Sequence, residues 1–187
     1  MGAAIISTIG HSTRSIEEFI EVLKAHGIGV VVDVRTAPRS RHVPQFNTDA
    51  LQAELDAAGI GYVHMKELGG WRKPRPDSPN TGWRNESFRG YADYLLTPEF
   101  EAGMGRLMDL GQRQRIAIMC AEAVPWRCHR SLIADALVVR GVEVRHITGA
   151  DAAAPHELTD FARVDGVRIT YPGTGHLPEQ PALDRPQ

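Results

Sequence analysis

The sequence has few cysteines, little net charge and no long apolar run. Two cysteines among 187 residues cannot form a framework of disulfides. A net charge of -2 gives the chain no general attraction to nucleic acid or to a membrane surface, so such a function would need a local patch. No stretch approaches the roughly 18 apolar residues of a membrane-spanning helix. The first seven residues lack the features of a signal peptide, and we expect a cytoplasmic protein with reduced thiols.

A repeated pattern runs along the chain: an amphipathic helix, a glycine, and then an apolar, β-branched run. The first helix is expected to begin after Ser15, because Ser15 and Glu18 have the spacing of a capping box. Gly27 suits the left-handed position that ends such a helix. Strands are expected at Ile5–Ile9, Val30–Val34, Tyr62–Met65, Ile116–Cys120 and Val142–Ile147. A second helix is expected after Asn47, its N-cap, and should stop near Gly59. A longer helical region is expected from Ser87 to Leu110, with a break at Thr97-Pro98. The last helix is expected from His129 to Gly141.

Five strands that alternate with four helical regions predict the α/β class. The strands lack polar alternation, which is typical of strands covered on both faces. We therefore predict a single-domain, open, mainly parallel five-stranded doubly wound sheet of the Rossmann or flavodoxin type, with helices on both faces. The domain would span residues 1–171, with a long loop or lid at 69–86 and a flexible tail at 172–187. A short helix over Pro155–Ala162 and a strand over Val167–Tyr171 would complete it.

Polar residues follow the predicted strands at the points where the strands end. Ligands of open parallel sheets bind at this edge, so these residues predict a site there. The alternative explanation is that polar residues follow the strands only because loops are generally polar, and that no ligand binds there. The residues are His11 and Ser12 after the first strand, Asp33, Arg35 and Arg39 at the second, Gly69 and Gly70 after the third, and Cys120 and Glu122 at the fourth.

Both cysteines lie in one connection, Cys-Ala-Glu-Ala-Val-Pro-Trp-Arg-Cys-His-Arg-Ser, at residues 120–131. Cys128 lies near a predicted helix start beside arginines, and both features lower the pKa of a thiol. Arg130 opposes the helix dipole there, which predicts that it meets an anion or Glu122. The position of Cys120 resembles that of the nucleophile in rhodaneses and cysteine phosphatases. However, six residues separate Cys120 from Arg127, and Pro125 removes a backbone donor, so a phosphate cradle does not fit.

Two other interpretations of the cysteines remain open. Cys120, Glu122, Cys128, His129 and His11 are all suitable metal ligands, although the spacing of the cysteines matches no familiar zinc motif. Free cysteines are also often small buried apolar side chains. The sequence therefore identifies neither a metal nor any other cofactor.

Two basic segments adjoin the predicted site. Residues 35–48 contain three arginines and no acid, and residues 71–84 combine Arg and Lys with two tryptophans. Cations beside aromatic rings suit phosphates and unstacked bases. An anionic small molecule is the expected partner, and nucleic acid is the alternative. Solvated loop arginines would explain the same residues without any ligand.

Four motifs, in this order, resemble the family called domain of unknown function 488. They are TIGHSTRSIEEFIEVLKAHGI, VVDVRTAPRSRHVPQFN, YVHMKELGG and CAEAVPWRCHRSLIADAL, and the resemblance runs from about Ile5 to Ile147. It implies an α/β domain and no established reaction. The signature positions map onto Gly10, His11, Ser12, Asp33, Arg35, Pro38, Arg39, Phe46, Asn47, Leu68, Gly69, Gly70, Cys120, Glu122, Cys128, His129 and Arg130.

The preferred hypothesis is an enzyme, a hydrolase or transferase with Cys/His chemistry, that binds an anionic, nucleotide- or phosphate-like ligand at the C-terminal ends of the strands. The alternatives are a nucleic-acid-binding accessory module and a protein that binds metal through Cys120, Cys128 and His129. The predicted catalytic residues are His11, Asp33, Cys120, Glu122 and Cys128. The predicted ligand-binding residues are Ser12, Arg35, Arg39, Gly69, Gly70, His129 and Arg130.

Overall fold

A computed structural model describes residues 4–173. Its strands are β1 (Ile5–Gly10), β2 (Val30–Asp33), β3 (Gly61–His64), β4 (Ile116–Cys120), β5 (Glu143–Gly149), β6 (Ala152–Pro155), β7 (Arg163–Asp165) and β8 (Arg168–Thr170). Its α-helices are α1 (Ile16–Ala25), α2 (Thr48–Ala57), α3 (Glu86–Tyr94), α4 (Pro98–Arg113) and α5 (Arg130–Val138). Three single turns of 3-10 helix are η1 (Pro44–Phe46), η2 (Lys66–Leu68) and η3 (Pro125–Arg127).

The central sheet has the strand order β3-β2-β4-β1-β5-β6. The five predicted strands are present and pair in parallel, which confirms the predicted doubly wound α/β class. A sixth strand, β6, pairs antiparallel with β5 and was not predicted. The fourth strand lies between the first and second, so Cys120 is the register partner of Gly10.

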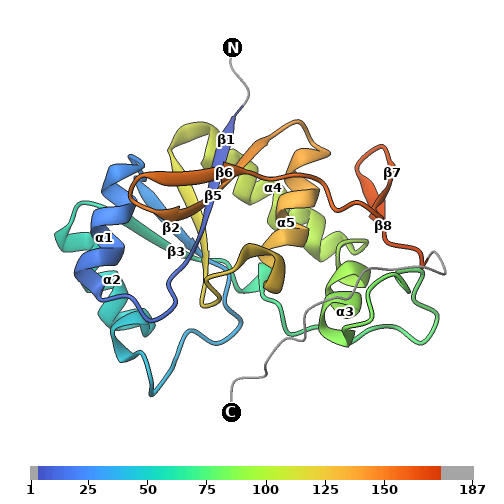
Figure 1. The fold of residues 1–187 in the computed structure, drawn as a ribbon, viewed down its shortest axis with the longest axis horizontal. Coiled ribbons are helices and arrows are strands. Elements are labelled where there is room, and N and C mark those ends of the chain that lie inside the picture. Colours follow the sequence, from blue (N-terminus) through green and yellow to red (C-terminus); the bar gives the residue numbers. More distant parts are fainter. Residues whose placement is uncertain (1–3, 174–187) are drawn as a thin grey trace.

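Helices cover both faces of the sheet (Figure 1). On one face, α1 and α2 pack side chains such as Phe19 and Leu51 against Val31 of β2. On the other face, α3, α4 and α5 pack against the opposite side of the same strands, including Val32. Because both sides of each central strand are buried, the strands need continuous apolar sequence, which is the pattern that predicted them.

Local signals fix most of the helix boundaries. The Ser15 side chain accepts a hydrogen bond from the Glu18 amide at 3.1 Å, and Thr97 caps α4 with Pro98 in its first turn, as predicted. Asn47 occupies the predicted N-cap position of α2 but does not cap it with its side chain. The side chain instead accepts from the Ser40 amide at 2.7 Å. Asn47 therefore tethers the preceding loop.

Residues 69–85 contain no helix or strand, and part of this segment is fixed by one buried carboxylate. Asp93 of α3 accepts hydrogen bonds from the Arg75 amide, the Ser78 hydroxyl and the Asn80 side-chain amide, at 2.8, 2.6 and 2.7 Å. Trp83 is also buried, and its ring stacks on that of Phe88. These contacts attach the second half of the segment to the domain.

A second buried carboxylate, Asp135 of α5, holds the segment that follows β6. It accepts hydrogen bonds from His156, from the Thr159 amide and hydroxyl, and from the Tyr171 hydroxyl. These side-chain bonds take the place of the expected helix over Pro155–Ala162, which is not formed. The expected strand near the end is present as β8, which forms a hairpin with β7.

Most of the predicted tail lies outside the described residues. Within residues 4–173, no helix combines the length and apolar character needed to cross a membrane.

Candidate functional site

The candidate site lies where the connections of the central sheet change face. The chain leaves β1 toward α1 on one face, and leaves the adjacent β4 toward α5 on the other. Such switch points are where open α/β sheets bind ligands. The two connections touch here, because the His11 amide donates to the Cys120 carbonyl at 2.9 Å. A Cβ on Gly10 would lie 1.9 Å from the Glu122 carbonyl oxygen, so only glycine permits this approach.

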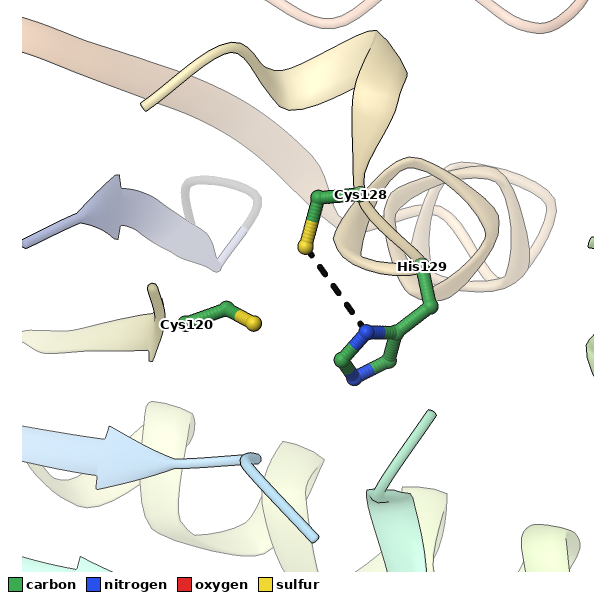
Figure 2. A group of neighbouring side chains, drawn as sticks. All are labelled: Cys120, Cys128 and His129. Carbon is green, nitrogen blue, oxygen red and sulfur yellow. Dashed lines mark hydrogen bonds between the residues drawn. The ribbon is translucent and has the colours of Figure 1, made fainter. Parts of the chain in front are cut away.

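Cys120, Cys128 and His129 form the centre of the site. The Cys120 side chain points from the end of β4 toward Cys128 and His129, which precede α5 (Figure 2). The two sulfur atoms and one imidazole nitrogen lie within 4.8 Å of one another, and Cys128 Sγ is 3.7 Å from His129 Nδ1. Cys128 is buried, whereas Cys120 and His129 are partly exposed. Residues that are apart in sequence therefore present three potential metal ligands to one point.

The His129 ring is held from several sides. Its Nε2 lies 3.2 Å from the Val34 carbonyl, which can only accept, so Nε2 carries the proton. Tyr91 packs edge-on against the ring with centroids 5.0 Å apart. A Cβ on Gly70 would lie 2.6 Å from Nδ1, so Gly70 leaves room for the imidazole. Nδ1 is thereby held on the side of Cys128 Sγ, 3.7 Å away.

Arg130 lies beneath Cys128 and is fully buried. Its Nε is 3.4 Å and its backbone amide 3.5 Å from Cys128 Sγ. Burial disfavours ionisation of the Cys128 thiol, but its hydrogen bond with Cys120 and the charge of Arg130 outweigh burial and hold its pKa well below the usual range. The same neighbouring sulfur, together with burial, raises the pKa of Cys120. Of the two sulfur atoms, Cys128 is therefore the one whose surroundings favour the thiolate.

A second group, built from Asp33, Arg35 and His11, lies beside the cysteines. Arg35 donates to both oxygens of Asp33, with Nη2 at 2.7 Å from Oδ2, and Tyr62 donates to the same oxygen at 2.7 Å. Arg35 also donates to the Phe46 carbonyl, and its Nη1 lies 3.2 Å from His11 Nε2. Every guanidinium nitrogen of Arg35 thus has a protein acceptor, and these bonds fix the orientation of the guanidinium.

His11 is a neutral histidine with a defined tautomer. Arg35 can only donate, so His11 Nε2 accepts, and Nδ1 donates to the Ser12 carbonyl at 2.8 Å. Burial, followed by the charge of Arg35, lowers the pKa of His11 to about 4, although the Ser12 carbonyl opposes this shift. Ser12 itself has a φ of 50°, in the left-handed region. His11 thus joins the two groups without carrying a charge at neutral pH.

The other predicted site residues lie around these groups in different roles. The Glu122 carboxylate accepts from the Val124 amide at 3.0 Å and closes the loop after β4. A Cβ on Gly69 would meet the Thr36 hydroxyl at 2.5 Å, so this glycine serves close packing. Arg39 is exposed. Sequence reasoning missed Thr8, which accepts from Arg130 at 3.2 Å; a polar residue within an apolar strand was the available signal.

The family model for the domain of unknown function DUF488 matches residues 15–137. The chain belongs to this family. The matched region contains Cys120, Cys128, His129 and Arg130, whereas His11 and the segment beyond α5 lie outside it. Comparisons with curated proteins and with solved structures found no match.

Proposed function

We propose that this protein is a metalloenzyme in which Cys120, Cys128 and His129 hold one divalent transition-metal ion and leave a fourth position for a ligand. The observation that carries the proposal is the approach of their three donor atoms to within 4.8 Å of one another. Tetrahedral zinc with sulfur and nitrogen ligands places those ligands about 3.5–3.8 Å apart. The 3.7 Å between Cys128 Sγ and His129 Nδ1 already has this length, so only a small movement is needed.

The surroundings of His129 support this role. Histidines that bind metals usually donate their other ring N–H to a fixed acceptor, which orients the ring and selects the tautomer. The Val34 carbonyl is such an acceptor for Nε2, while Gly70 and Tyr91 confine the ring.

The ligand types favour zinc, with iron as the other expected metal. Thiolates and imidazole are the ligands that zinc and iron prefer over oxygen-rich sets. Structural zinc sites have four protein ligands, whereas catalytic sites keep three and an open position. Such an ion polarises a bound substrate or activates water, which fits a hydrolase or a group-transfer enzyme.

The test is the metal content of freshly purified protein, measured by inductively coupled plasma mass spectrometry. We expect one zinc or iron ion per chain in the wild type. Cys120→Ser, Cys128→Ser and His129→Ala should each reduce the content to background while circular dichroism shows retained folding. His42→Ala is the matched control, because His42 is exposed, and it should keep the metal. Equal content in all variants, or no binding after reconstitution under reducing conditions, would reject the proposal.

A metal-free cysteine enzyme is the second candidate. The contacts of Arg130 with Cys128 favour it, because a thiolate is a nucleophile as well as a metal ligand. This candidate predicts rapid alkylation of Cys128 at pH 7 and slow alkylation of Cys120. The metalloenzyme proposal predicts that added zinc protects both. Fast alkylation that zinc does not slow would favour the cysteine enzyme.

The nucleic-acid alternative rests on two exposed tryptophans close in sequence to the site. Trp71 is 71% exposed and follows Gly70, and Trp126 is 67% exposed and precedes Cys128 by two residues. Exposed Arg39 and Arg127 could add phosphate contacts. This alternative predicts binding of single-stranded DNA that weakens steeply with salt. The absence of binding at low salt would remove it.

A further inference from the structure

Arg130 is a buried cation without a carboxylate partner among residues 4–173. Its hydrogen-bond partners are the Thr8 hydroxyl, the Glu122 carbonyl and Cys128 Sγ. Thr8 and the carbonyl are neutral, so the Cys128 sulfur is the one partner that can carry negative charge. A buried charge is costly unless an opposite charge compensates it. Cys128 Sγ is therefore the contacting group that can compensate the charge of Arg130.

Metal binding changes this balance. Binding of a divalent ion deprotonates Cys120 as well, because thiolates are the ligands. The ion, two thiolates and a neutral imidazole sum to zero charge. The negative charge of the Cys128 sulfur then balances the charge of the metal ion. Arg130 adds one positive charge, and none of its hydrogen-bond partners among the described residues carries a further negative charge. The occupied centre and Arg130 together carry a charge of +1.

We propose that the fourth position at this metal selects small anionic ligands over neutral ones, with Arg130 supplying the charge that the anion neutralises. This inference rests on the proposed function and names its substrate class: a molecule that presents an anionic oxygen, such as a carboxylate or a phosphate ester. Arg130 acts here as a positioning residue through its charge, since its guanidinium contacts Cys128 and not the ligand.

Cys120 and His129 are partly exposed, whereas Cys128 and Arg130 are buried, so a fourth ligand would approach on the side of Cys120 and His129. The Arg130 charge would lie roughly 5–6 Å from the ion, given the 3.4 Å contact with Cys128 and a metal–sulfur bond of about 2.3 Å. An anion bound to the ion would lie roughly 6–8 Å from the guanidinium, where a unit charge at an effective dielectric constant near 20 changes anion affinity by about 30- to 100-fold.

The experiment uses protein reconstituted with cobalt(II), whose visible spectrum reports the ligands. Azide serves as the anionic probe and imidazole at pH 8 as the neutral one. We expect azide to bind the wild type more tightly than imidazole. Arg130→Met should weaken azide binding by about 30- to 100-fold and leave imidazole binding within about threefold. Arg145→Met, at an exposed arginine paired with Glu143, should change neither affinity.

Unchanged azide affinity in Arg130→Met, or an equal loss for azide and imidazole, would overturn the inference. If Arg130→Met does not fold, Arg130→Lys replaces it in the test. Arg130→Lys keeps the positive charge and should keep the preference for azide over imidazole. Tighter binding of imidazole than of azide to the wild type would also overturn it. Failure of the proposed function looks different, because cobalt would then give no thiolate charge-transfer band before any probe is added.

Discussion

At the scale of single residues, the most informative side chain is Arg130. A cation in the first turn of a helix opposes the helix dipole, and the sequence predicted that it meets an anion or Glu122. Its guanidinium contacts the Glu122 carbonyl and Cys128 Sγ, not the Glu122 carboxylate. The prediction correctly named Glu122 as a neighbour of Arg130. It did not identify the contacting atom as the Glu122 carbonyl oxygen, because sequence spacing does not distinguish the backbone of Glu122 from its side chain. Arg130 thus supports Cys128 whether or not metal is present.

The first prediction concerns the stability of the metal-free protein. Cys128→Ala removes the partner of a buried cation and should lower the free energy of unfolding by about 3 kcal/mol. Adding Arg130→Met to that variant should recover part of the loss, which gives a coupling of about 2 kcal/mol between the two sites. Urea unfolding with chelator and reductant measures these values. Strictly additive effects would show that Arg130 and Cys128 do not form a charge pair.

At the scale of elements, the site depends on where β4 lies. The apolar runs and capping residues predicted the strands and most of the helices, because these signals are local. The order β3-β2-β4-β1-β5 was not predicted, since it depends on contacts between distant segments. That order places Cys120 beside Gly10 and brings Met119 opposite Asp33. The grouping of His11, Asp33 and Cys120 at one edge was predicted, whereas their division into two clusters required the structure.

The second prediction tests how the segment after η2 supports His129. Gly70→Ala would place a methyl group 2.6 Å from His129 Nδ1, so the ring must move. Loss of such support usually reduces metal affinity by about 10- to 100-fold. Gly105→Ala in α4 is the matched control, because a Cβ there meets nothing within 4 Å, and it should retain metal and gain about 0.5–1 kcal/mol of stability. Competition with a chromogenic chelator measures both affinities. Equal affinities would show that Gly70 does not position His129.

At the scale of the whole molecule, buried polar groups join the sheet to its peripheral segments. Asp93 holds part of the 69–85 segment, and Asp135 holds the segment after β6. His146 of β5 belongs to the second network: Thr8 lies 2.7 Å from its Nδ1, and its Nε2 lies 2.8 Å from His156. The short helix expected at 155–162 is absent because these side chains hold that segment, a long-range effect that local sequence does not reveal.

The third prediction follows from two buried histidines. Burial lowers the pKa of both His11 and His146 to about 4. Each therefore takes up a proton in the unfolded chain below about pH 6.5 but resists protonation in the folded protein. Stability should then fall as pH decreases from 6.5 toward 4, by roughly 1.4 kcal/mol per pH unit for each histidine. Urea unfolding at pH 6.0, 5.5 and 5.0 measures this slope.

A variant isolates the contribution of His11. His11→Asn should have a slope smaller by roughly 1.4 kcal/mol per pH unit, because one of the two histidines no longer titrates on unfolding. His42→Asn replaces an exposed histidine and should keep the wild-type slope. If His11→Asn has the same slope as the wild type, burial does not keep His11 neutral.

The most direct test of the central claim is X-ray absorption at the metal K-edge of the reconstituted protein. The account predicts a first shell with two sulfur atoms at about 2.3 Å and lighter scatterers, including one imidazole nitrogen, at about 2.0–2.1 Å. Cys120→Ser should remove one sulfur from that shell. A first shell made only of nitrogen and oxygen in the wild type would show that the metal does not bind Cys120, Cys128 and His129, and would contradict the account.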